Sequence, residues 1–111
     1  MKDLPDIQTT FTEVVATREY DLSRNGICKK LVVEIGEPIN DVETVCGYDW
    51  RCPLRLTFEN TIIIKNACGS DSYQALYLCL SQLVQLEVER FANSINSIIE
   101  LLGEEYNFKD Y

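Results

Sequence analysis

The segment from Asp49 to Glu59, DWRCPLRLTFE, limits most strongly what this chain can form. Every second residue is large and apolar or a cysteine: Trp50, Cys52, Leu54, Leu56 and Phe58. The residues between them include Arg51, Arg55, Thr57 and Glu59. Because side chains of a strand point alternately to the two faces of a sheet, this pattern predicts a strand with one buried face. Pro53 has no backbone N–H, so we expect it at an edge, at a bulge or at the strand's start.

Two further strands are predicted before this segment. Residues 9–20 are rich in β-branched side chains, and Asn25-Gly26 is a turn signal because both residue types tolerate positive φ. In residues 27–35, Ile27, Leu31, Val33 and Ile35 share one face, and Gly36 and Pro38 end the strand. We expect these two strands to form a hairpin and residues 40–49 to form a polar loop.

A fourth strand is predicted in TIIIKNA, which begins at Thr61. A three-residue turn would place Phe58 opposite Ile62, whereas a two-residue turn would bring Ile63 to the core face. The sequence leaves this register open, since a shift of one residue exchanges the two faces of a strand.

The stretch GSDSYQALYLCL, residues 69–80, reads as the start of a helix. Asp71 stands three residues before Gln74, as in a capping box, and Ser70 is a competing cap. Apolar residues then recur at spacings of three and four: Leu76, Leu80, Leu83, Val84, Val88, Phe91, Ile95, Ile98, Ile99 and Leu102. We expect an amphipathic helix over 71–102 that ends at Gly103. An anion at the helix start is the functional alternative, but Asp71 would repel it.

The predicted fold is therefore α+β: a single domain, residues 1–111, with a four-stranded, mainly antiparallel sheet followed by a long C-terminal amphipathic helix. At about 1.5 Å per residue the helix would measure about 48 Å, longer than the sheet. It either breaks near residues 92–96 or packs its second half on another molecule.

The charge balance narrows the classes of partner. The chain has 18 acidic and 10 basic residues, a net charge of −8 and no histidine. Nucleic acid and anionic membranes would repel it, and a basic protein partner is favoured; the simpler interpretation is that acidity only keeps the protein soluble. Without histidine the usual general base is missing, which disfavours an enzyme, although a pair of carboxylates among Glu34, Glu37, Asp41, Glu43 and Asp49 remains an alternative.

The cysteines suggest a reducing compartment. There are five of them, an odd number, and the start MKDLPDIQTT lacks the apolar stretch of a signal peptide. We expect reduced thiols in a cytoplasmic protein, with Cys52 and Cys79 as small buried residues. The cysteine spacing is poor for zinc, so we expect neither a metal nor another cofactor.

Two motifs carry a resemblance. At Trp50-Arg51-Cys52-Pro53 and at Gly69 to Leu76 the chain resembles a small, functionally uncharacterised bacterial family with a Cys-Pro strand and a Gly-x-Asp-Ser-x-Gln-Ala-Leu helix start. The resemblance covers roughly residues 27–90 and implies the strand, hairpin and helix layout, but no catalytic residues. By type, as a small acidic histidine-free protein, the chain is also similar to the immunity proteins that bacteria make against toxic nucleases.

The first functional hypothesis is a non-catalytic protein that neutralises a basic protein. The favoured partner is a bacterial toxin domain, such as a nuclease. The alternative is a structural or regulatory module that forms a homodimer through its helix. The residues expected to bind the partner are acidic or aromatic and belong to the central loop and the tail: Glu37, Asp41, Glu43, Tyr48, Asp49, Glu104, Glu105, Tyr106, Asp110 and Tyr111.

Overall fold

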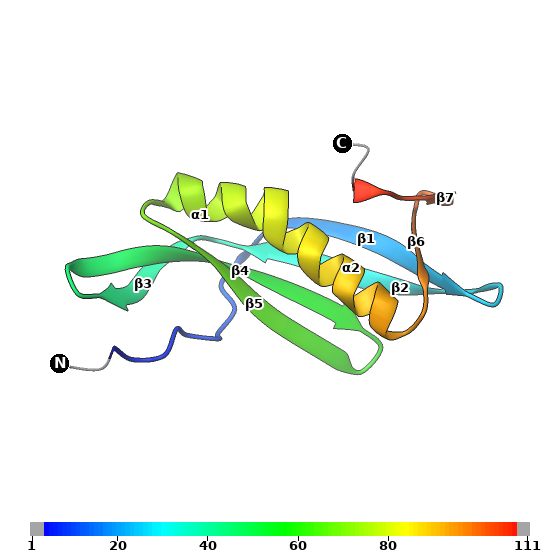
Figure 1. Cartoon of the computed structure of the whole chain (residues 1–111), viewed down its shortest axis with the longest axis horizontal. Helices are drawn as coiled ribbons and strands as arrows, with labels where there is room; N and C mark the ends of the chain where they lie inside the picture. The colour runs from blue at the N-terminus through cyan, green and yellow to red at the C-terminus, as the bar shows by residue number, and fades with distance from the viewer. Residues whose placement is uncertain (1–3, 109–111) are drawn as a thin grey trace.

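An antiparallel sheet of seven strands is the framework of residues 4–108, the part of the chain that the computed structural model describes. The strands are β1 (Val14–Arg24), β2 (Ile27–Gly36), β3 (Ile39–Thr44), β4 (Gly47–Phe58), β5 (Thr61–Gly69), β6 (Ile98–Leu101) and β7 (Glu104–Glu105). One helical segment covers one face of this sheet (Figure 1). The predicted α+β class and antiparallel pairing are confirmed, whereas the predicted count of four strands was too low.

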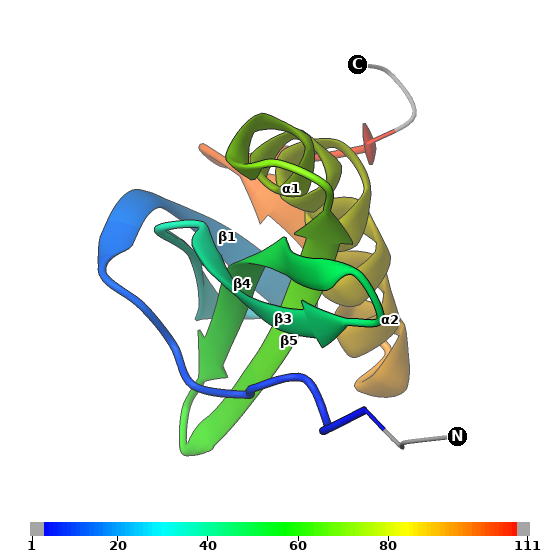
Figure 2. The ribbon, with the colours of Figure 1, turned by 90° about the vertical axis from the view of Figure 1, so that its left-hand side faces the viewer.

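The β1–β2 hairpin forms at the predicted turn. Asn25 and Gly26 have φ of 53° and 78°, and Arg24 pairs with Ile27 across them. β1 begins at Val14 and not at residue 9, as was predicted. The preceding segment, residues 4–13, instead crosses the sheet face that lies opposite the helix (Figure 2).

The strand predicted from the alternation at Trp50 to Phe58 is β4, and its Cys52, Leu54 and Leu56 are buried. The expectation for Pro53 was wrong, because it lies buried inside the strand. On one side of β4, Leu54 pairs with β2 and Arg51 pairs with β3. Pro53 lies between these two pairings, so its missing N–H falls where the partner strand changes.

Residues 40–49 were predicted to be a polar loop, and this was wrong. They form most of β3, a tight turn and the start of β4. The chain after Phe58 follows the two-residue alternative: Phe58 pairs with Thr61 and Leu56 with Ile63. Ile63 thus lies on the core face of the sheet with Leu56.

The helix starts as predicted, and Gly69, Asp71, Gln74 and Ala75 of the motif each have a structural role. The Asp71 Oδ1 atom accepts a hydrogen bond of 2.7 Å from the Gln74 N–H, and Gln74 Oε1 accepts one of 2.7 Å from the Ser70 N–H. A side chain at Gly69 would place its Cβ 2.7 Å from the backbone nitrogen of Ala75, which is fully buried. Capping and close packing therefore account for the Gly-x-Asp-Ser-x-Gln-Ala-Leu pattern.

A π-helical turn shifts the buried side of the helix by one residue. The segment consists of α1 (Ser72–Leu78), the π-helical turn η1 (Cys79–Leu83) and α2 (Val84–Ser94). Its buried residues that pack on the sheet are Ala75, Cys79, Val84, Val88 and Ala92. The step from Cys79 to Val84 is one residue longer than the others, because η1 adds a residue to that turn. Leu80, which was predicted to lie in the core, is consequently 53% exposed.

The helix ends at Ser94, within the break predicted near residues 92–96, and does not continue to Leu102. Ile98 and Ile99, which fitted the helical spacing, belong to β6 and pair with β1. Gly103 does not end a helix; with Leu102 it makes the turn into β7, and both residues have positive φ. None of the helices in the described residues is long and apolar enough to cross a membrane.

Candidate partner-binding surfaces

Arg51 in β4 is a buried cation whose five N–H groups all have acceptors. Its side chain is 1% exposed. Nε and Nη2 donate to the two carboxylate oxygens of Asp41 at 2.7 and 3.1 Å. The other three bonds reach the Thr10 carbonyl at 2.7 Å, the Thr10 hydroxyl at 3.0 Å and Asn66 Oδ1 at 3.0 Å. Arg51 therefore ties β3, β5 and the N-terminal segment to β4.

Arg55, the second outward arginine of β4, makes a smaller set of contacts on the same face. Its Nε donates to Glu34 Oε1 on β2 at 2.9 Å, and its guanidinium lies 4.1 Å from the centre of the Phe11 ring. Both arginines thus pair with acids on neighbouring strands. Arg51, which is buried and has all five donors used, has none left for a phosphate or a carboxylate of a ligand.

We define the hairpin surface as Glu37, which precedes β3, together with Glu43, Val45, Tyr48 and Asp49 of the β3–β4 hairpin; all of these except Val45 were expected from the sequence. The β3–β4 hairpin lies at one end of the molecule, nearest the viewer in Figure 2. Val45 is 85% exposed and Tyr48 60%. No Lys or Arg nitrogen of residues 4–108 lies within 4 Å of the three carboxylates. This surface thus combines uncompensated negative charge with exposed apolar area.

Asp41, expected from sequence to contact the partner, has a different position. Its carboxylate is occupied by Arg51, and its side chain is 27% exposed. Its ion pair with Arg51 joins β3 to β4, so Asp41 is not available as a free acid. Val45 was missed by the sequence analysis, although a β-branched residue inside a polar stretch was the signal for it.

The tail residues form a separate group. Glu104 and Glu105 on β7 are exposed. Tyr106 is half-buried, with its ring centre 5.4 Å from that of Tyr20 in β1 and 4.8 Å from that of Phe108. Tyr106 and Phe108 therefore fold back against Tyr20 and close the core at this end. Asp110 and Tyr111, also expected to bind, lie outside the described residues.

The two groups do not make one surface. The β3–β4 hairpin and β7 lie towards opposite ends of the long axis, along which the molecule extends 53 Å (Figure 1). A typical interface covers about 800 Å² of each partner, a patch roughly 30 Å across. A single partner of ordinary size therefore covers the hairpin surface or the tail acids, and not both.

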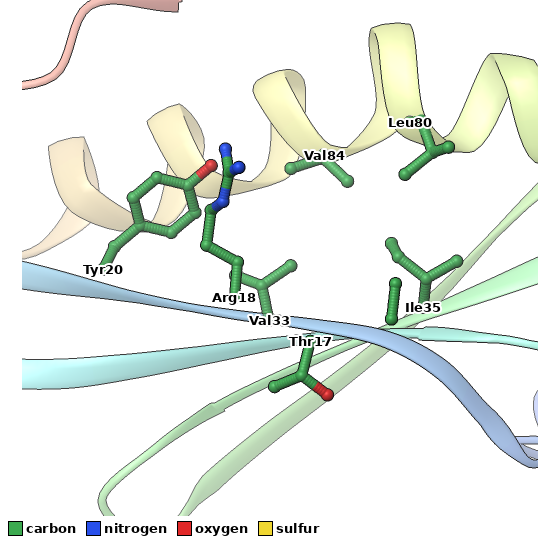
Figure 3. A pocket seen from close by; sticks show the side chains of 8 residues that line it. Thr17, Arg18, Tyr20, Val33, Ile35, Leu80 and Val84 are labelled. Carbon is green, nitrogen blue, oxygen red and sulfur yellow. The ribbon is translucent and has the colours of Figure 1, made fainter. Parts of the chain in front are cut away.

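A groove between β1 and the helix was not foreseen from the sequence. It has a volume of about 230 Å³. Its lining residues are Ala16, Thr17, Arg18, Tyr20, Val33, Ile35, Leu80 and Val84. Figure 3 shows Arg18 rising from β1 beside the Tyr20 hydroxyl, below the helix residues Val84 and Leu80. A hydrogen bond to Tyr20 raises the pKa of Arg18, so this cation keeps its charge.

The five cysteines are free thiols, and they divide by exposure. Cys28 and Cys46 are exposed, and Cys68 is half-buried. Cys52 and Cys79 are fully buried, as predicted, and the Cys52 thiol donates a hydrogen bond of 3.4 Å to the Gly36 carbonyl. Hydrogen bonding to the neighbouring Cys52 and burial raise the pKa of the Cys79 thiol. Residues 4–108 contain no group of three or more Cys, Asp or Glu side chains placed to hold a metal ion.

The acids that lie close in sequence do not form an acid–base pair. Glu34 and Asp41 are held by Arg55 and Arg51. Glu43 pairs with Tyr48 across the hairpin, and Asp49, the next residue, points to the other face. Two of these acids are therefore held by arginines, and Glu43 and Asp49 do not face each other.

No family model matches the chain, and no similar protein was found among curated proteins or solved structures. The surfaces described above therefore carry the argument on function.

Proposed function

We propose that the protein is a non-catalytic binding protein that neutralises a basic protein partner through the hairpin surface. One observation carries this proposal: Glu37, Glu43 and Asp49 have no cationic partner within the described residues, and Glu43 pairs across the hairpin with the exposed Tyr48, next to the turn that carries the exposed Val45. Free carboxylates attract a basic surface, and an exposed aromatic side chain supplies the kind of contact that dominates interface energies.

Two further properties support an inhibitor. The net charge of −8 steers a basic partner toward the molecule from a distance. The hairpin is held in place by the ion pair of Asp41 with the buried Arg51, so little conformational freedom is lost on binding. We infer a rigid, acidic surface that covers the partner's site by contact alone.

The partner class that fits best is a bacterial toxin that acts on nucleic acid. Such an enzyme needs basic residues to hold phosphates, and these residues are the complement of the hairpin surface. On this proposal the protein is an immunity protein of the cytoplasm, where its five thiols stay reduced.

Self-association through the helix is a second candidate, favoured by a different observation. Tyr73 and Tyr77 lie one turn apart on the helix and are 78% and 59% exposed. Their spacing places them on one stripe of the helix. The molar mass in solution separates this candidate from the first, since it requires a dimer of the pure protein.

The test of the first candidate is capture of the partner from the native host with two matched variants. Glu43→Lys with Asp49→Lys changes the hairpin surface, and Glu104→Lys with Glu105→Lys changes the tail; each pair moves the net charge from −8 to −4. We expect the wild type and the tail variant to recover the same basic protein and the hairpin variant to lose it. Recovery by the hairpin variant but not by the tail variant would contradict the proposal.

A further inference from the structure

β1 has an outer edge that is only partly covered. β2 pairs with the whole length of one side of β1, but on the other side β6 pairs only with Asp21, Leu22 and Ser23. Within residues 4–108 no strand pairs with this outer side of residues 14–19. An open edge of this kind presents backbone donors and acceptors that another strand can join.

The hairpin turn determines which backbone groups face the open edge. Arg24 and Ile27 flank the two-residue turn as a hydrogen-bonded pair, and such pairs alternate with non-bonded ones along an antiparallel ladder. The even residues of β1 therefore bond to β2. The N–H and C=O groups of Thr17 and Glu19 consequently point outward, as those of Asp21 and Ser23 do toward β6.

The side chains beside this edge form the groove between β1 and the helix. Arg18 projects toward the helix, whereas Thr17 points to the other side of the strand (Figure 3). Ala16, two residues before Arg18, lies on the same face of the strand as Arg18 and lines the groove. The groove beyond Ala16 is apolar, with the half-exposed Leu80 on its helical wall. A strand added at the edge would direct alternate side chains into this groove.

Arg18 gives the groove a charge that the rest of the described chain does not match. Its guanidinium lies beside the Tyr20 hydroxyl (Figure 3), and hydrogen bonding to Tyr20 and Tyr106 contributes to its raised pKa. In the described residues no carboxylate oxygen lies within 4 Å of its guanidinium. In a chain with a net charge of −8, a cation without an acidic partner beside an open edge fits an acidic group from elsewhere.

We propose that the outer edge of β1 binds an extended segment of another protein as an additional antiparallel strand with the pattern acidic–x–apolar. Its backbone bonds to Thr17 and Glu19. Its acidic side chain lies opposite Arg18, and two residues later its apolar side chain lies opposite Ala16, in the groove. The added strand continues the line of β6 along β1. This site is separate from the hairpin surface, and the proposal does not depend on the proposed function.

A second copy of the chain fits this edge less well. Antiparallel pairing of β1 with β1 of another copy, with the same faces aligned, would place Ala16 opposite Arg18 of that copy and bring the two arginines to neighbouring positions. Each copy also carries a net charge of −8. Pairing of two copies therefore sets like charges against each other, both at the two arginines and between the two molecules. An acidic segment, in contrast, neutralises Arg18.

The test is selection from a displayed library of random peptides of about eight residues, a usual length for a strand. We expect the wild-type protein to enrich peptides with the acidic–x–apolar pattern. Thr17→Pro removes the outward N–H without touching a bond to β2, and it should weaken binding of the enriched peptides about tenfold or more. Thr17→Val keeps the N–H and should bind as the wild type does; thermal unfolding of both variants checks their folding.

Arg18→Gln should weaken the same peptides about tenfold and remove the preference for an acidic residue. Enrichment of no peptide, or binding that neither substitution weakens, would overturn the proposal. Peptides lost with Arg18→Gln but kept with Thr17→Pro would assign the groove to a carboxylate ligand without strand addition. A dimer of the pure protein that Thr17→Pro dissociates would assign the edge to a second copy.

Discussion

Replacing Arg51 with methionine should test how much the hydrogen bonds of this side chain contribute to the stability of the fold. Methionine keeps the apolar stem but removes all five hydrogen bonds, two of them to the Asp41 carboxylate. A net hydrogen bond contributes about 1 kcal/mol, and one to a charged group about 1.5–3 kcal/mol. Water can reach Asp41, which is 27% exposed, so part of the loss is recovered. We expect the free energy of unfolding to fall by about 3 kcal/mol.

The matched control is Arg55→Met on the same strand. Arg55 is 31% exposed and makes a single ion pair with Glu34, so its loss should cost about 1 kcal/mol. Urea unfolding at two salt concentrations measures both values, and only the smaller Arg55 contribution should shrink with salt. Equal losses for the two variants, or a loss below about 1 kcal/mol for Arg51→Met, would refute the reasoning about burial and donor satisfaction.

Two further predictions concern the core. Leu56→Ala should lower the free energy of unfolding by about 2–5 kcal/mol, because Leu56 is 1% exposed. Leu80→Ala should lower it by under about 1 kcal/mol, because Leu80 is 53% exposed. Equal losses in urea unfolding would show that η1 does not expose Leu80. Because the hydrogen bond with Cys52 and burial raise the pKa of the Cys79 thiol, the unfolded chain releases this proton first, from about pH 8.5 upward. The free energy of unfolding should then fall by up to about 1.4 kcal/mol per pH unit above that value, and Cys79→Ala should show a shallower fall when unfolding is measured from pH 7 to 10.

The sequence predicted those elements whose signals are local. Asn25-Gly26 specifies its turn, the alternation at Trp50 to Phe58 specifies β4, and Asp71 with Gln74 specifies the helix start. In each case a few adjacent residues determine backbone geometry or the buried face, whatever the rest of the chain does.

Elements that depend on distant partners were missed. β3 is half-exposed and polar, and it is a strand because β4 and the ion pair of Asp41 with Arg51 hold it. Ile98 and Ile99 have helical spacing relative to the preceding stripe, but β-branched residues also suit strands, and the outer side of β1 was available to pair with them.

The candidate site was predicted only in its composition. The acids and Tyr48 of the hairpin surface were named from their charge and type, but separation of the tail acids from them follows from the path of the chain through the sheet. The role of Asp41 depends on the buried Arg51, and no local signal distinguished that arginine from Arg55. The groove beside Arg18 depends on η1, which no pattern in the sequence revealed.

The rate of association with the captured partner, measured by stopped flow at low and high salt, tests the central claim most directly. Steering by charge raises association rates about 10–1,000-fold, and salt screens it beyond about 8 Å at physiological ionic strength. Glu43→Lys with Asp49→Lys should slow association at low salt about tenfold more than Glu104→Lys with Glu105→Lys does, and high salt should reduce that difference. An association rate that does not change with salt, or that both pairs of substitutions slow equally, would contradict binding of a basic partner at the hairpin surface.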